Sequence, residues 1–177
     1  MLNVELRDTA EDMWTKLPPI AIGQTAAAPT MHALVSHNGK PVMRIDVHAQ
    51  ADDPFREAIV WGSFIVIAFG DRIHFVSIPT RTVASYPVAT YVGHFYAVEG
   101  RLIVTDRERI HCFDHTGTQL WKSVALAAHG VVIHRIEGDR IEGQGEWETP
   151  YGWQSFKVHL WSGMLFDRGE IGERLSA

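Results

Sequence analysis

The sequence predicts an all-β fold built from repeated four-stranded units. From Glu57 onward, short runs of β-branched and aromatic residues are separated by Gly and Asp turns, with no helical period between them. The runs also recur. Gly-Asp-Arg-Ile-His-Phe at 70–75 returns as Arg-Glu-Arg-Ile-His-Cys at 107–112, and Val-Glu-Gly-Arg-Leu at 98–102 returns as Ile-Glu-Gly-Asp-Arg-Ile at 136–141. Equivalent positions lie 37 and 38 residues apart, a period that holds four short strands.

The first part of the chain is expected to hold a short helix and a linker. Thr9 and Asp12 have the spacing of a capping box, which predicts a helix that ends before Pro18. The Ala-rich stretch that follows is typical of a linker. We therefore divide the chain into an N-terminal helix and linker at 1–30 and a single β-repeat domain at 31–177.

A hairpin and three repeat units are expected next. The hairpin has strands at 31–36 and 42–49, because Asn38-Gly39 readily supplies the positive φ angles that a two-residue turn demands. This hairpin could be half of a further unit. The three repeat units are expected at about 57–88, 89–124 and 128–169.

The third repeat unit is longer than the other two, and we expect the excess to form a long loop at 144–152. Large aromatic rings next to carboxylates make a contact surface for a basic or aromatic partner. The alternative is that Trp147 and Trp153 fold back and cap the end of their own sheet. The candidate partner-binding residues are Glu146, Trp147, Glu148, Tyr151 and Trp153.

One segment resembles a known family. Residues 112–121, Cys-Phe-Asp-His-Thr-Gly-Thr-Gln-Leu-Trp, resemble the outer-strand turn of β-propeller repeats of the pyrroloquinoline-quinone-enzyme-like (WD-like) type. The spacing from Thr-Gly to Trp fits that pattern, whereas the gap after Asp114 is one residue short. Weaker similarities lie at 79–83 and 162–166. The resemblance covers about two thirds of the chain and implies propeller architecture only, so no functional residue is carried over.

The number of repeats predicts an open or partial β-propeller. A closed propeller usually needs at least about four blades, and the sequence offers three four-stranded units plus the N-terminal hairpin. The hairpin could complete a small fourth blade, or the sheets could stack as an open sandwich. Because exposed sheet edges invite pairing, we favour an open arrangement completed by a homodimer.

Composition excludes several classes of protein. The chain has 177 residues, 46% of them hydrophobic, and a formal net charge of -5, which gives no general attraction to nucleic acid or to an anionic membrane. No apolar run approaches the roughly 20 residues of a membrane span, and no secretory signal is recognised, so a cytoplasmic location is expected. With Cys112 as the only cysteine, an intrachain disulfide and a multi-cysteine zinc site are impossible.

Histidine and cysteine offer two further candidate sites. His74 and His111 occupy equivalent repeat positions and could bind a metal, but no further ligand lies at a fixed spacing, and we assign no metal and no cofactor. Cys112 has His115 nearby, as a catalytic thiol would require. Strand alternation turns His111 away from Cys112, so a small buried hydrophobe is the expected role.

Two classes of function stay open. The leading interpretation is a non-enzymatic β-repeat protein that binds another macromolecule, of the bacterial accessory, regulatory or immunity type. It depends on the repeat architecture and on the lack of catalytic motifs. The alternative is a small-ligand or metal-dependent enzyme whose site is assembled from dispersed His, Asp and Glu, such as His94, His129 and His134.

Overall fold

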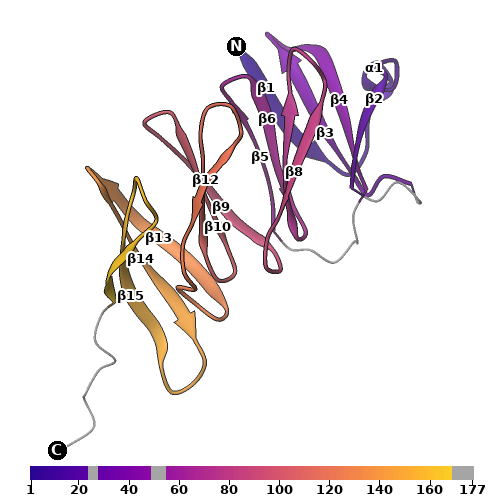
Figure 1. Cartoon of the computed structure of the whole chain (residues 1–177). Helices are drawn as coiled ribbons and strands as arrows, with labels where there is room; N and C mark the ends of the chain where they lie inside the picture. Colours follow the sequence, from indigo (N-terminus) through magenta and orange to yellow (C-terminus); the bar gives the residue numbers. More distant parts are fainter. Residues whose placement is uncertain (24–27, 49–54, 169–177) are drawn as a thin grey trace, which may run out of the picture. The chain divides into compact units, whose positions relative to one another are not determined.

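The computed structural model describes residues 1–23, 28–48 and 55–168 (Figure 1). Within these ranges the chain forms four four-stranded sheets and one short helix, α1 (Asp12–Thr15). The expected all-β fold is therefore confirmed. We name the sheets A to D in chain order. No helix in the described part of the chain is long and apolar enough to cross a bilayer.

The chain divides into two compact halves, Met1–Val92 and Gly93–Ala177. The N-terminal half contains sheets A and B, and the C-terminal half contains sheets C and D, apart from the first residue of sheet C. The single domain expected at 31–177 stays a prediction.

Sheet A contains the expected hairpin, with one further strand on each side. The strand order is β1 (Leu2–Arg7), β3 (Met31–His37), β4 (Lys40–His48) and β2 (Pro19–Gly23). β1 runs antiparallel to β3, whereas β2 runs parallel to β4. Asn38 and Gly39 have φ of 50° and 77°, which confirms the predicted turn.

The N-terminal segment is more β-rich than the sequence predicted. The helix lies within the first seventeen residues, as expected, but it is one turn long, and its N-cap is Glu11 with no side-chain hydrogen bond. The capping box from Thr9 to Asp12 is therefore wrong. Leu2–Arg7 alternates partly buried and exposed residues and pairs with β3 as a strand. Sheet A therefore contains strands from both sides of the boundary predicted at residue 30. Part of the predicted linker, 24–27, lies outside the described residues.

Sheets B, C and D are antiparallel meanders at the three predicted repeat positions. Sheet B consists of β5 (Arg56–Trp61), β6 (Phe64–Phe69), β7 (Arg72–Ser77) and β8 (Val83–Pro87). Sheet C consists of β9 (Val92–Val98), β10 (Arg101–Asp106), β11 (Ile110–Phe113) and β12 (Gln119–Lys122). Sheet D consists of β13 (Gly130–Glu137), β14 (Arg140–Trp147), β15 (Gly152–His159) and β16 (Leu165–Arg168).

The turn between the third and fourth strand is closed in a similar way in all three meanders, but in sheet C it is one residue shorter. Its backbone bond runs from Ser77 N to Thr82 O, from Asp114 N to Thr118 O, and from His159 N to Met164 O. Each turn contains one residue with positive φ: Arg81, Gly117 or Gly163. The three segments that resemble propeller turns are therefore equivalent in structure, and this confirms the repeat.

Each half has its own hydrophobic core between two sheets. In the N-terminal half, Met31 and Ile45 of sheet A pack with Ile65 and Ile67 of sheet B. In the C-terminal half the core residues include Ile103 and Cys112 of sheet C and Ile141, Phe156 and Val158 of sheet D. The two sheets of each half thus pack against one another through apolar faces, as propeller blades do.

The Gly163 turn provides a test of the packing between sheets C and D. Gly163 has a φ of 70°, and a Cβ there would lie 2.4 Å from Cε3 of Trp121. Gly100 has a φ of 73° but open space around it. We expect Gly100→Ala to lower the free energy of unfolding by about 1–2 kcal/mol through backbone strain. Gly163→Ala should lower the free energy of unfolding by about 1–3 kcal/mol more than Gly100→Ala does, because the added methyl group overpacks against Trp121.

Urea denaturation of the two variants measures this difference. Because both glycines have nearly the same φ, the Gly100 variant is the control for strain alone. Equal midpoints for the two variants would contradict the contact between Trp121 and Gly163.

Candidate functional site

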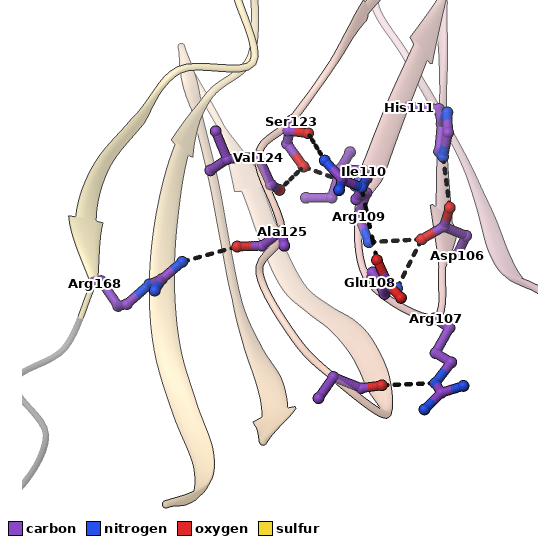
Figure 2. A network of polar contacts seen from close by, with 11 residues as sticks. Asp106, Arg107, Glu108, Arg109, Ile110, His111, Ser123, Val124, Ala125 and Arg168 are labelled. Atoms are coloured by element: carbon purple, nitrogen blue, oxygen red, sulfur yellow. Dashed lines mark hydrogen bonds and ion pairs between the residues drawn. The ribbon is translucent and has the colours of Figure 1, made fainter. Parts of the chain in front are cut away.

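A polar network fixes the segment that connects sheet C to sheet D, residues 123–129, which we call the crossover (Figure 2). At its centre, Asp106 Oδ1 accepts hydrogen bonds from the backbone N–H groups of Glu108 at 2.7 Å and Arg109 at 2.6 Å. Asp106 Oδ2 lies 2.8 Å from His111 Nε2. The side chains of Asp106 and His111 are 1% and 3% exposed, so this carboxylate closes the β10–β11 turn from inside the protein.

The start of the crossover is bonded to the same turn. Ser123 Oγ accepts the N–H of Ile110 at 3.0 Å and donates to Val124 O at 2.8 Å. The guanidinium of Arg109 donates to Ser123 O at 3.3 Å. Leu126 N donates to Glu108 O at 2.7 Å.

The rest of the crossover is bonded from both sheets. Arg107, in the β10–β11 turn, donates to Ala128 O at 2.6 Å, and Arg168, on β16, donates to Ala125 O at 2.8 Å (Figure 2). On the other side, Glu146 O of β14 accepts Ala128 N at 2.8 Å and His129 N at 3.0 Å. The crossover therefore sets the position of β14 relative to sheet C.

The pair formed by Asp106 and His111 has a structural role. Nδ1 of His111 lies 2.9 Å from the amide nitrogen of Gln119, which can only donate. His111 Nδ1 is therefore the acceptor, and Nε2–H donates to Asp106. Both ring nitrogens are engaged in a buried position, so the imidazole has none left for a substrate.

His74 occupies the equivalent position in sheet B, as the repeat predicted. It is 4% exposed, and its Nδ1 lies 2.8 Å from Ser85 Oγ. Burial, with a smaller contribution from the charge of Arg72, lowers the pKa of His74 to about 4. Both repeat histidines are thus buried rather than scattered over the surface. Among the described residues, no three His, Cys, Asp or Glu side chains are grouped so that they could hold a metal ion.

A second buried carboxylate lies in sheet A on the face away from sheet B. Asp46 Oδ1 lies 2.8 Å from His32 Nδ1 and 2.9 Å from Arg44 Nε, and Asp46 Oδ2 accepts from Arg44 Nη2 at 3.0 Å. Burial alone would raise the pKa of Asp46, but the bonds from Arg44 and His32 outweigh it and lower the pKa. Arg44 also donates to Trp14 O at 3.4 Å, so this cluster holds α1 against sheet A.

Cys112 is fully buried in the C-terminal core, as predicted for a small hydrophobe. Burial raises the pKa of its thiol, which opposes formation of the reactive thiolate. His94, His129 and His134 are exposed.

The predicted long loop at 144–152 is wrong. β14 continues to Trp147 and β15 begins at Gly152, so the connecting turn contains only residues 148–151. The predicted loop included Gly145. A Cβ at Gly145 would lie 1.9 Å from Leu126 O, so this strand position is glycine because the crossover passes directly over it.

The extended hairpin separates the five candidate residues. Trp147 alternates with Glu146, so it lies on the same face as Gly145, and the guanidinium of Arg168 lies 5.1 Å from its ring centroid. The position of Trp147 therefore matches the alternative in which this ring folds back over its own sheet. On the opposite face, Trp153 is 50% exposed and pairs in register with Glu146.

Glu148 and Tyr151 lie in the turn itself, and the Tyr151 side chain is 54% exposed. Four of the five candidates thus lie in this turn or directly beside it, with Glu146 half-buried and the other three exposed. We call this feature the hairpin tip; it consists of Glu146, Glu148, Tyr151 and Trp153.

Sequence reasoning missed a second exposed group at the outer strands of sheets C and D. Trp161 is 42% exposed and carries the guanidinium of Arg101 at 4.5 Å from its ring centroid. Met164 and Leu120 are 62% and 44% exposed. The sequence signal for this exposed turn is Ser162-Gly163, which directly follows Trp161.

Comparison with known proteins identifies no family. No protein-family model and no curated protein matches the chain. Among solved structures, the chain is similar to the crystal structure of the N-terminal domain of Nup159, with a TM-score of 0.40 and 12% sequence identity. The similarity covers 99% of this chain and 53% of that chain, so this chain spans about half its length. A similarity of this extent carries no argument about function. The four-stranded repeat sheets agree with propeller-like architecture, but no comparison supports the quinone-enzyme family itself.

Removal of Asp106 tests the crossover network. Asp106→Ala leaves two backbone N–H groups and His111 without their buried acceptor, so we expect the free energy of unfolding to fall by about 3–5 kcal/mol. Asp114 is the matched control, because its carboxylate likewise accepts from Thr116 N at 2.9 Å and Thr118 N at 3.0 Å, but in a partly exposed turn. Asp114→Ala should cost about 1 kcal/mol. Similar chemical-denaturation midpoints for the two variants would contradict a central role for Asp106.

The pH dependence of stability tests the burial of His74. In the unfolded state His74 binds a proton near pH 6.5, whereas in the folded state it binds one only near its pKa of about 4. The free energy of unfolding should therefore be highest above pH 6.5 and fall by about 3 kcal/mol between pH 6.5 and pH 4. His74→Gln should remove this part of the slope, and His134→Gln, at an exposed position, should keep it. If urea titrations across this pH range give the same dependence of unfolding free energy on pH for wild type and His74→Gln, the lowered pKa of buried His74 is disproved.

Proposed function

We propose that this chain is a non-enzymatic β-repeat protein that binds another protein, and that the hairpin tip is its contact surface. The observation that carries the proposal is the half-exposed pair of rings, Trp153 and Tyr151, next to Glu146 and Glu148. Aromatic side chains contribute much contact area at a small entropic cost, and neighbouring charges select and steer the partner.

The rigid support beneath the tip favours binding. Glu146 and Trp153 lie on paired strands, and Glu146 O is bonded to the crossover through Ala128 N and His129 N. Gly145 packs directly against Leu126. A surface that is already ordered loses less conformational entropy when a partner binds, which strengthens the complex.

The enzyme alternative receives no comparable support. The closest acid–imidazole pairs are the buried pair Asp106 with His111 and the largely buried pair Asp46 with His32, and each serves its own sheet. His94, His129 and His134 belong to no metal-binding group within the described ranges. We therefore retain the binding function.

The proposal also includes the expected homodimer. Sheet D ends in β13 and β16, and no further strand of the described chain pairs with their outer edges. Unpaired strand edges favour association with a second copy. In this proposal the dimer forms away from the hairpin tip, which stays available to the partner.

A double variant tests the tip as the contact surface. Tyr151→Ser with Trp153→Ser should reduce partner binding about tenfold or more, because exposed Tyr and Trp are typical hot-spot residues. Leu120→Ser with Met164→Ser removes exposed apolar side chains elsewhere in the same half and is the matched control. Each immobilised chain is exposed to lysate of the source organism, and a retained protein is then purified and its affinity for each chain measured.

Thermal denaturation and light scattering accompany the binding measurement. The proposal requires that the tip variant keep the melting temperature and mass of the wild type while it loses the purified partner, and that the control variant keep the partner. Equal binding by all three chains would refute the contact surface. A clearly lower melting temperature of the tip variant would show that the rings belong to the core.

A further inference from the structure

Three aromatic rings of the C-terminal half already carry a guanidinium from the same chain. The ring-centroid distances are 4.5 Å for Arg101 over Trp161, 5.8 Å for Arg140 over Phe166 and 5.1 Å for Arg168 over Trp147. An arginine over a ring face is thus a contact that sheets C and D use repeatedly. Each of these rings has its cationic partner in place.

Trp153 and Tyr151 differ from those rings. No arginine of the described chain lies over either of them, and both side chains are at least half exposed. Glu146 stands directly opposite Trp153 on the same face, at a typical Cβ separation of about 4.5–5.5 Å for such pairs. An exposed ring face and a carboxylate therefore adjoin one another at the tip.

The charge around the tip is also unbalanced. Within the described residues, Glu146 and Glu148 form no ion pair, whereas Glu137 is paired with Arg135 and Asp167 with Lys157. The next register pair along the face is neutral, Gln144 with Ser155. Arg168 lies over Trp147 on the opposite face of the hairpin, so the described residues place no arginine over Trp153 and no ion pair on Glu146.

We propose that the hairpin tip binds an arginine side chain of the partner protein, with the guanidinium over the Trp153 ring and paired with the Glu146 carboxylate. This inference rests on the proposed function and names the chemistry of its partner. Arginine fits better than lysine, because its planar group stacks on a ring while it donates two parallel hydrogen bonds to a carboxylate. The two acids disfavour a nucleic-acid partner, because they repel phosphate.

The contribution of one such arginine is modest. Exposed cation–π contacts and exposed ion pairs are each worth about a two- to five-fold change in affinity. The arginine therefore defines the selectivity of the tip, and the remaining partner surface supplies most of the binding strength. A short peptide probe should bind weakly but with a clear preference for the guanidinium.

Nuclear magnetic resonance of the full chain tests the inference with defined probes. The indole N–H signal of Trp153 is assigned by its loss in Trp153→Phe, and its shift is followed during titration with the peptide acetyl-Gly-Arg-Gly-amide. The peptide with citrulline in place of arginine has the same shape without the charge. A third peptide carries lysine in place of arginine. We expect a saturable shift with the arginine peptide, weaker binding of the lysine peptide, and at least about fivefold weaker binding of the citrulline peptide.

Two variants separate the specific pair from general acidity. Glu146→Gln should weaken binding of the arginine peptide about two- to five-fold. Glu142→Gln is the matched control, since Glu142 lies on the same strand and the same face but opposite Lys157. It should leave the affinity unchanged. Equal losses in the two variants would overturn the assignment of the carboxylate.

The remaining outcomes distinguish this inference from the proposed function. If the Trp153 signal does not move, or moves equally with citrulline, the arginine inference fails, although the tip variant can still lose the purified partner. If the tip variant retains the partner, the proposed function itself fails. A tip variant whose mass by light scattering falls from dimer to monomer would show a second copy at the tip, and this also overturns the inference.

Discussion

The arrangement of the C-terminal half depends on one buried carboxylate. Asp106 closes the β10–β11 turn, and that turn holds the crossover through Leu126 N and the guanidinium groups of Arg107 and Arg109. The crossover in turn contacts β14 at Gly145 and Glu146. Because a buried charge is costly unless it is well hydrogen-bonded, Asp106 fixes the conformation of this turn. The crossover, which is bonded to the turn, then fixes the position of the hairpin tip.

The repeat could be predicted from the sequence because its signals are local. Ile73 and Ile110 lie at equivalent strand positions, and the third-to-fourth-strand turn needs a positive φ at Gly117 and Gly163. Such turn residues and strand alternation act within a few neighbours. The four-stranded meanders of sheets B, C and D followed from them.

The predictions that proved wrong concern positions whose structure depends on contacts with segments distant in sequence. Gly145 resembles a loop residue until Leu126 is known to pass over it, and Leu2–Arg7 becomes a strand because β3 supplies its partner. Glu146 and Trp153 were grouped as candidates because they are near in sequence, and the strand register pairs them. The orientation of Trp147 toward the opposite face depends on a strand register that only the long hairpin sets.

The parallel pairing of β2 with β4 sets sheet A apart from the three meanders. Sheet A cannot be another copy of the meander, and α1 with the buried Trp14 covers its face away from sheet B. Sheet D keeps the regular meander, and its face away from sheet C bears the bare ring of Trp153. In the N-terminal half the outer face of sheet A is thus covered by the chain itself, whereas in the C-terminal half the outer face of sheet D carries an exposed aromatic ring.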